Sequence, residues 1–219
     1  MRLWDDNQRH RISELKDSMT PPPGQQKQDG RRLRSEVSRR RIVEAMRELI
    51  REGAVAPRAE EVAARADVGL RSVFRHFDDM ESLYREIAEA MLVEVTPMLN
   101  LPQPAGTTAE IVAEMIDRRI KLFERIMPFR TAADVHLHRS PFLLEDRLRM
   151  NEMLRKAMRS ALPAEFRKDR TLLDALEAVF SFEFWRRLRW DQQLSPAQAR
   201  RTVELAVSSL LDAKPRGKA

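Results

Sequence analysis

Residues 59–83, AEEVAARADVGLRSVFRHFDDMESL, contain two short helical patterns with a break between them. In the first pattern, Val62, Ala63 and Ala66 form a small apolar face, and residues 67–69 then interrupt the period. Small alanine side chains allow two helices to cross closely, and a turn of a few residues sets such helices at a steep angle. The stretch therefore predicts a helix-turn-helix.

The second helical pattern begins at Leu70 and has an apolar side and a basic side. Leu70, Val73 and Phe77 share one face at the 3.6-residue period of a helix. Arg71 and Arg75, which are four residues apart, point the other way. A short helix with an apolar inner face and an arginine-bearing outer face suits entry into the major groove of DNA.

We expect this helix to contact DNA together with one arginine that precedes it in the sequence. The predicted DNA-binding residues are Leu70, Arg71, Ser72, Phe74, Arg75, His76 and Arg39. The planar fork of arginine matches the acceptor atoms of guanine in the major groove. A solvated face is the alternative for the two arginines of the helix, and Phe74 is expected to pack or to touch a sugar or a thymine methyl group.

These residues resemble the helix-turn-helix of the TetR family of bacterial repressors. That family tends to read Ile-Ala, Ala-Gly-Val-Ser, Tyr-x-x-Phe and Lys-x-x-Leu, in this order. The corresponding places here are residues 62–63, 66–69, 74–77 and 80–83, which read Val-Ala, Ala-Asp-Val-Gly, Phe-Arg-His-Phe and Met-Glu-Ser-Leu. By this resemblance, His76 stands where the family often has a tyrosine or histidine that meets a phosphate.

Four positions depart from the family pattern. Asp67 stands in place of the turn glycine, and aspartate tolerates a left-handed backbone better than most residues do. Gly69 replaces a hydroxyl N-cap, Phe74 lacks the tyrosine hydroxyl, and Met80 lacks the lysine charge. The apolar packing pattern is the same as in the family.

The resemblance implies an all-α fold with an N-terminal three-helix helix-turn-helix domain and a C-terminal helical regulatory and dimerisation domain. It implies a homodimer that binds a roughly palindromic operator in double-stranded DNA, most often as a repressor. An unknown small-molecule effector in the C-terminal domain would change the separation of the two recognition helices. Two major-groove half-sites need a spacing of about 34–36 Å, so a modest hinge movement can abolish binding.

We divide the chain into three parts. Residues 1–34 are expected to be a flexible, partly basic extension, residues 35–82 the helix-turn-helix domain, and residues 83–219 a helical ligand-binding and dimerisation domain. The prolines at 21–23 predict a linker. The arginines that crowd residues 31–41 predict either a solvated tail or an arm that lies on the phosphate backbone or in the minor groove.

Capping patterns predict where the helices begin and end. We expect the first helix to be capped by Ser38 and ended by Gly53, and the fourth to be capped by Asp78 with Glu81 and to reach about Thr96. The later helices are expected from Thr107 to before Pro128, over residues 131–138, from Pro141 to before Pro163, over residues 171–190, and from Ser195 onward.

Methionine and aromatic side chains of the C-terminal part are mostly core filler, but as a group they can also line an adaptable pocket. The predicted pocket residues are Met91, Met115, Phe123, Met153, Phe180 and Phe184.

The last two long helices carry more apolar surface than one monomer would easily cover. In TetR-like proteins the corresponding helices pair with their symmetry mates, and a purely intrachain core is the alternative. The predicted dimer-interface residues are Leu176, Trp185, Leu188, Val203, Val207 and Leu210.

Composition narrows the class of protein further. The formal net charge of +6 and the pI near 10.1 favour a polyanionic partner. The chain has no cysteine, which excludes disulfides and fits a reducing compartment. No apolar run reaches the roughly 18 residues of a membrane span, and residues 1–20 are too charged for a secretory signal. We expect a cytoplasmic protein with no membrane partner.

The sequence contains no Gly-rich phosphate loop, nucleophile elbow or HExxH motif. His136 and His138 are two residues apart and do not share a helix face, which disfavours a metal site. We therefore expect no enzyme activity, no catalytic residue, no metal and no cofactor. The second interpretation is a helical DNA-binding architectural or adaptor protein without a ligand, which a C-terminal domain lacking a cavity would favour.

Overall fold

The computed structural model describes the backbone of residues 23–213 and the side chains of residues 32–213. Over this range the chain is all-α, as predicted, with no strand. The elements are α2 (Pro23–Arg51), α3 (Ala59–Arg65), α4 (Leu70–His76), α5 (Met80–Leu99), α6 (Thr108–Asp134), α7 (Pro141–Ala161), η1 (Phe166–Lys168), α8 (Arg170–Val179), α9 (Phe182–Arg186), η2 (Arg187–Asp191) and α10 (Pro196–Asp212). The expectations for residues 1–22 and 214–219 lie outside the described residues.

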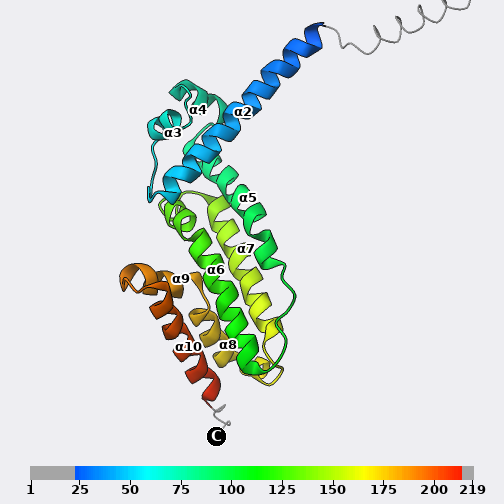
Figure 1. Cartoon of the computed structure of the whole chain (residues 1–219), viewed down its shortest axis with the longest axis vertical. Helices are drawn as coiled ribbons and strands as arrows, with labels where there is room; N and C mark the ends of the chain where they lie inside the picture. The colour runs from blue at the N-terminus through cyan, green and yellow to red at the C-terminus, as the bar shows by residue number, and fades with distance from the viewer. Residues whose placement is uncertain (1–22, 214–219) are drawn as a thin grey trace, which may run out of the picture.

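The helices form two connected groups along the long axis of the molecule (Figure 1). Helices α2, α3 and α4 form a small group at one end, and α5 runs from this group into a larger one that contains α6 to α10. Helix α6 is central, because α2, α5, α7, α9 and α10 all pack against it. The helix-turn-helix end is thus followed by a helical body, as predicted.

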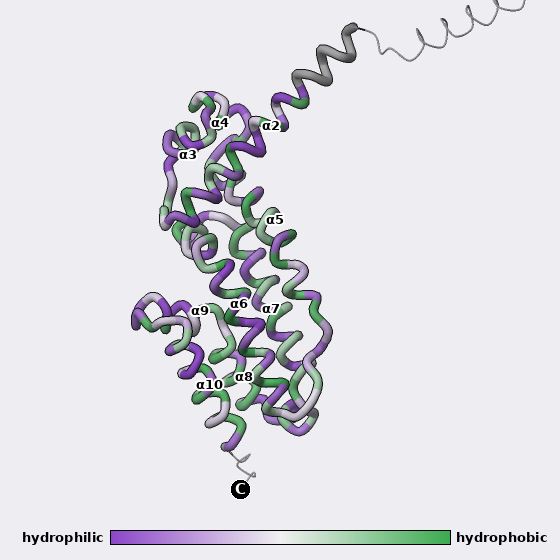
Figure 2. Tube along the Cα trace, viewed as in Figure 1, coloured by the Kyte–Doolittle hydropathy of each residue, from purple (hydrophilic) through white to green (hydrophobic). Residues whose placement is uncertain are grey.

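Hydrophobic and hydrophilic residues recur in turn along α5, α6 and α7, as in amphipathic helices (Figure 2). The buried residues form one core that extends from Met46 on α2 through Ile87 on α5 to Phe123 on α6. The two groups of helices therefore share a continuous apolar interior.

Helix α2 begins at Pro23 rather than at the expected cap Ser38, which lies inside the helix. Proline is favoured at the first helical position, because the N–H that it lacks has no helical partner there, and residues 24–51 contain no further proline. Residues 23–34 are consequently helical, which differs from the expected flexible extension. The predicted end is confirmed: Gly53 has a φ of 104°, and the Ala54 N–H donates to the Leu49 carbonyl at 3.0 Å.

Helix α5 is capped one residue later than expected. The Asp79 carboxylate accepts from the Ser82 N–H at 2.7 Å, so Asp79 rather than Asp78 is the N-cap. The helix also continues past Thr96 to Leu99 and includes Pro97 in its last turn. The predicted caps Thr107, Ser140 and Ser195 are confirmed, and each accepts from an N–H in the first turn of α6, α7 or α10: Glu110, Leu143 and Gln198 respectively.

Two predicted helix boundaries are wrong because packing overrides the local signal. Helix α6 continues through Pro128 to Asp134, and Ile126 and Phe129 on either side of the proline are buried. The separate short helix expected over residues 131–138 is therefore absent, since residues 131–134 belong to α6 and residues 135–139 form turns. Conversely, the helix expected over residues 171–190 is broken between α8 and α9. Residues two apart point to different sides of a continuous helix, and the break lets Phe180 and Phe182 both face the core.

We predict that Asp79→Ala lowers the free energy of unfolding by about 1 kcal/mol, because it removes the N-cap bond to Ser82. Asp78→Ala is the matched control, since Asp78 is exposed and makes no cap bond, and its effect should stay within about 0.5 kcal/mol. Urea unfolding followed by circular dichroism measures both. Equal losses in the two variants would contradict this assignment of the cap.

Candidate nucleic-acid interface

Helix α4 buries one side and exposes the other. Val73 and Phe77 are buried, which confirms the predicted inner face at these two positions. Arg71, Phe74 and Arg75 are exposed, and Phe74 keeps half of its surface accessible to solvent. Helix α4 lies at one end of the molecule (Figure 1), so its two exposed arginines and its aromatic ring face solvent there.

The other predicted contacts on α4 are less exposed. Leu70 was expected on the inner face, but it is 37% exposed at the open start of the helix. Ser72 is half-buried, and its hydroxyl lies 3.4 Å from the Arg75 Nη2 atom. Leu70 is therefore available to a partner, and Ser72 can orient Arg75.

Asp67 sets the turn between α3 and α4, with a φ of 53°. An aspartate accepts this left-handed conformation more readily than most residues do, as we expected from its place in the turn. The N–H groups of Asp67 and Val68 donate to the carbonyls of Ala64 and Ala63 at 3.3 and 3.0 Å. Gly69 has a φ of −69°, so α4 begins without a positive φ and without a side-chain cap.

Helix α3 is held against the end of α2 by apolar packing and by one paired arginine. Val62 and Ala63 are buried, and Arg65 donates through both terminal nitrogens to Glu52 at 2.8 and 2.6 Å. The hydrogen bonds from Arg65 hold the pKa of the Glu52 carboxyl below its ordinary value. Because exposed ion pairs contribute little to stability, this pair mainly fixes how α3 lies beside α2.

Arg39 has a position that differs from the one expected of a DNA contact. Its Nη1 atom donates to the His76 carbonyl at 2.8 Å, and its Nη2 atom donates to Glu86 on α5 at 2.6 Å. The guanidinium carbon lies 4.5 Å from the centre of the Phe77 ring. Arg39 thus joins α2, α4 and α5, and it positions the recognition helix instead of projecting toward DNA.

His76 lies half-buried at the end of α4, and its Nε2 atom is buried with no partner among the described residues. Burial, followed by the positive charges of Arg75 and Arg39, lowers the pKa of His76. The imidazole is therefore mostly neutral at pH 7. A phosphate contact by His76 remains a prediction, and in the free protein it starts from an uncharged ring.

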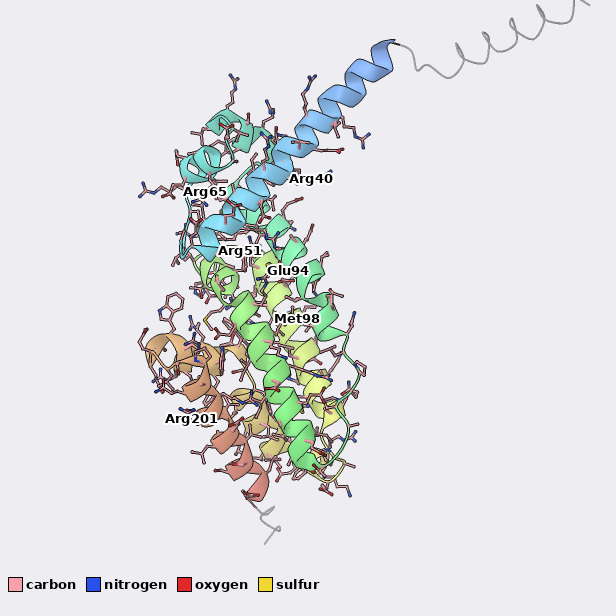
Figure 3. All side chains as sticks on the ribbon, in the orientation of Figure 1. Arg40, Arg51, Arg65, Glu94, Met98 and Arg201 are labelled. Carbon is pink, nitrogen blue, oxygen red and sulfur yellow. The ribbon has the colours of Figure 1, made fainter. Side chains whose placement is uncertain are left out.

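Further arginines lie on α2 beside this helix. Arg34, Arg40 and Arg41 are exposed, and no carboxylate within the described side chains pairs with any of them. Arg40 is labelled on α2 in Figure 3. Together with Arg71 and Arg75, these side chains make one end of the molecule basic, and a basic surface attracts the phosphate backbone.

A short arginine-bearing helix that packs through its apolar face on two neighbouring helices defines a helix-turn-helix DNA-binding protein. Residues 42–87 match the family model described as bacterial regulatory proteins, tetR family. Residues 42–87 are thus a DNA-binding domain of the tetR type, which implies a DNA-binding transcriptional regulator. Such regulators act by binding DNA rather than as enzymes. A search of the curated proteins found no match.

The helical body contains a small cavity and a wider groove. The cavity has a volume of about 90 Å³ and lies between α5, α6 and α7. The groove has a volume of about 660 Å³ and lies between α6, α7, α8 and α9. Most of the cavity wall is apolar. Four of the lining residues have polar side chains: Tyr84, Arg130, Asp146 and Arg147.

The predicted pocket residues do not converge on one site. Met91 lines the cavity between α5, α6 and α7. Phe180 lines the groove, and Met115 and Phe123 line smaller gaps. Met153 and Phe184 line none of these spaces. These residues do not share one of the cavities described above, because residue type alone does not tell which helix face a methionine or phenylalanine occupies.

Sequence reasoning missed Tyr84 and Arg130 as cavity residues. A signal for Arg130 exists in the sequence: it continues the i, i+3, i+4 stripe formed by Ile126 and Phe129. A charged residue on an apolar stripe of a long helix is a candidate for an internal role.

The six predicted dimer residues lie largely inside a single chain. Five of them are buried: Leu176, Trp185, Leu188, Val203 and Val207. Leu210 is partly buried against the same core. The indole N–H of Trp185 donates to Glu124 on α6 at 2.8 Å. These residues therefore pack largely within the chain, because α6 and α8 cover the apolar face of α10 and α6 also packs against α9; their part in a dimer remains a prediction.

Two further observations on the described residues concern membranes and metals. Within residues 23–213, no helix is long and apolar enough to cross a membrane. Among the described side chains, no group of three or more histidines and carboxylates is arranged to hold a metal ion.

We predict that Arg71→Ala and Arg75→Ala each weaken binding to a specific operator by about 1–3 kcal/mol, since each removes a fork that can read a base edge. The stability of the fold should hardly change, because both side chains are exposed. Arg167→Ala is the control, because Arg167 is exposed on η1 in the helical body, away from α4 and α10. Fluorescence anisotropy with operator and random DNA measures the losses. Equal losses on both DNAs would show that the arginines contact only phosphates.

Proposed function

We propose that the chain is a homodimeric repressor that binds a palindromic operator through α4 and leaves it when a small molecule occupies the helical body. The observation that carries this proposal is the exposed face of α4, where Arg71 and Arg75 flank Phe74 on a helix anchored from behind. One such helix reads few base pairs. A second copy at a distance of about one turn of DNA supplies the remaining contacts.

The outer face of α10 is where we place the dimer contact. Helix α10 buries Ala199, Val203 and Val207 against the body, whereas Leu205 on the opposite side is 68% exposed. Arg201, one turn before Leu205, is labelled on the same helix in Figure 3. Helices α8 and α10 pack side by side along the body (Figure 1), so a two-fold axis at this face would make a four-helix arrangement.

A route for control by a ligand runs through α5. Arg47 on α2 donates to Glu94 on α5 at 2.5 Å, and Arg125 on α6 pairs with the same carboxylate. At the start of α5, the Ser140 hydroxyl donates to Glu81 at 2.8 Å and so joins α7 to α5. Helix α5 also lines the cavity. A ligand that changes the position of α5 would therefore change the position of α2 and, through Arg39, of α4.

Release from DNA by this route requires no chemistry. The ligand needs only a different affinity for the DNA-bound and the free arrangement of the dimer. The second candidate function is a DNA-binding adaptor without a ligand, which would need neither a ligand site nor two arrangements of the dimer. The cavity beside α5 favours the ligand-responsive repressor over the adaptor.

We predict that the basic face of α2 contributes to binding of any DNA sequence. The triple variant Arg34→Ala, Arg40→Ala and Arg41→Ala should flatten the slope of log K against log[salt] by about 0.9 for each phosphate contact that is lost. The matched control removes three exposed arginines from the body: Arg167→Ala, Arg170→Ala and Arg187→Ala.

Both triple variants lose the same net charge, so their comparison separates local contacts from the overall field of the protein. Anisotropy titrations at several salt concentrations give the slopes. If the α2 variant kept the slope of the wild type, this face would have no part in binding.

We predict that Leu205→Glu dissociates the homodimer, since the two-fold axis would place two carboxylates close together in a buried contact. Leaving such a charge unpaired costs roughly 3–5 kcal/mol, so the dimer dissociation constant should rise at least about a hundredfold. Val93→Glu on α5 is the control, because Val93 is also an exposed apolar residue, at 75%.

Sedimentation velocity at micromolar concentration, combined with operator titration, tests this prediction. The Leu205→Glu monomer should keep weak binding to random DNA and lose tight binding to a palindrome selected from a random pool. Val207 is not a substitute for Leu205, because it is buried and its replacement would disturb the fold of each chain. A wild-type monomer that still binds the palindrome tightly would refute the homodimer.

A further inference from the structure

The cavity between α5, α6 and α7 is small and mostly apolar. Ile87 and Met91 on α5 and Phe129 on α6 form part of its wall. Its volume of about 90 Å³ is below the roughly 150 Å³ of a dry cavity that accepts benzene. A ligand of this cavity therefore has a short aliphatic body or a small ring that the cavity expands to admit.

Arg130 brings a buried positive charge to this apolar wall. Its side chain is only 12% exposed, its Nη2 atom donates to Glu183 at 3.0 Å, and its guanidinium carbon lies 4.3 Å from the centre of the Phe182 ring. Burial lowers the pKa of Arg130 to about 10, so the group stays charged at neutral pH. Its Nη1 atom is buried and has no acceptor among the described residues, which is costly for a charged donor.

Tyr84 is the second lining residue with an unused polar atom. Its hydroxyl is buried and has no partner within the described part of the chain. Burial raises the pKa of Tyr84 to about 12, so the phenol keeps its proton at neutral pH and can donate it in a hydrogen bond. The cavity therefore has two lining residues that each keep a buried donor without an acceptor.

The remaining charged groups of the wall already have partners. Arg147 pairs with Asp134, and Asp146 accepts from Arg149 at 2.5 Å. Arg130 is therefore the lining cation with a buried donor that has no acceptor, and no lining carboxylate is left without a cation. This balance favours a ligand that brings a negative charge.

We propose that this cavity binds a small carboxylate, whose oxygens accept from Arg130 Nη1 and the Tyr84 hydroxyl and whose apolar body lies against α5. This inference rests on the proposed function and names the chemical class of its effector. Hydrogen bonds from a charged donor to a carboxylate are roughly twice as strong as those between neutral groups. The apolar body would contact the same helix that holds α2 through Glu94.

The test uses the whole chain described here by its sequence and a set of simple probes. Straight-chain carboxylates from butanoate to octanoate, and benzoate, are compared with the amides and amines of the same length by isothermal titration calorimetry. We expect the carboxylates to bind, the amides to bind about tenfold more weakly, and the amines not to bind. Affinity should rise with chain length until the cavity is full.

Two variants connect this binding to the named atoms. Tyr84→Phe removes only the hydroxyl, and Arg130→Met keeps an apolar stem without the charge. Each should weaken carboxylate binding at least about tenfold, and Arg130→Met should also abolish the preference for carboxylate over amide. Arg119→Met is the matched control, because Arg119 is a second largely buried arginine of α6 but lines the groove and not the cavity.

Several outcomes would overturn the proposal. These are equal binding of amide and carboxylate, unchanged carboxylate binding in Tyr84→Phe, tighter binding of the amine, or no binding of any probe at millimolar concentration. Tighter binding of the amine would show that Asp146 recognises the ligand. The absence of binding would show that the cavity holds only water. Tyr84→Phe keeps the test open if Arg130→Met fails to fold.

An operator-release assay separates this inference from the proposed function. If carboxylates bind as described but do not release operator DNA, the carboxylate site stands and ligand control fails. If a neutral compound releases the DNA while carboxylates do not bind, ligand control stands and the carboxylate site is wrong.

Discussion

The structure depends on the burial of Phe77 beneath the guanidinium of Arg39. Helix α4 has 7 residues, and an isolated helix of that length is unstable in water. Its position therefore comes from its neighbours. Arg39 lies 4.5 Å from the Phe77 ring and uses its remaining donors on the His76 carbonyl and on Glu86. One side chain thus connects α2, the end of α4 and the first half of α5, so the exposed arginines of α4 move with α5.

Helix α5 has different partners on its different faces. Tyr84, Ile87 and Met91 line the cavity, while Glu86 and Glu94 hold the arginines of α2. Because both sets of contacts belong to one helix, a change in the packing of the cavity face would alter the anchor of the DNA-binding end. The proposed coupling needs no long path through the protein, since one helix carries both contacts.

The helix-turn-helix was predictable because its signals are local. The left-handed turn at Asp67, the helix end at Gly53 and the cap at Ser140 each follow from residues a few positions apart. The predictions that failed concern features that depend on packing between distant parts of the chain. Pro128 remains inside α6 because of the buried side chains around it, and an apolar stripe such as that of Val207 does not reveal whether α6 or a second chain covers it.

The roles of individual arginines were the hardest to predict, and the reason is the phase of the helix. With a cap at Ser38, Arg39 belongs to a basic run at a helix start, and all its members look equivalent. Arg39 nevertheless continues the i, i+3, i+7 stripe of Ile42 and Met46 toward the core, wherever the helix begins before it. Arg130 extends the stripe of Ile126 in the same way. In both helices the arginine on the apolar stripe is the one with an internal role, and this rule could be applied to the sequence once the helix boundaries were known.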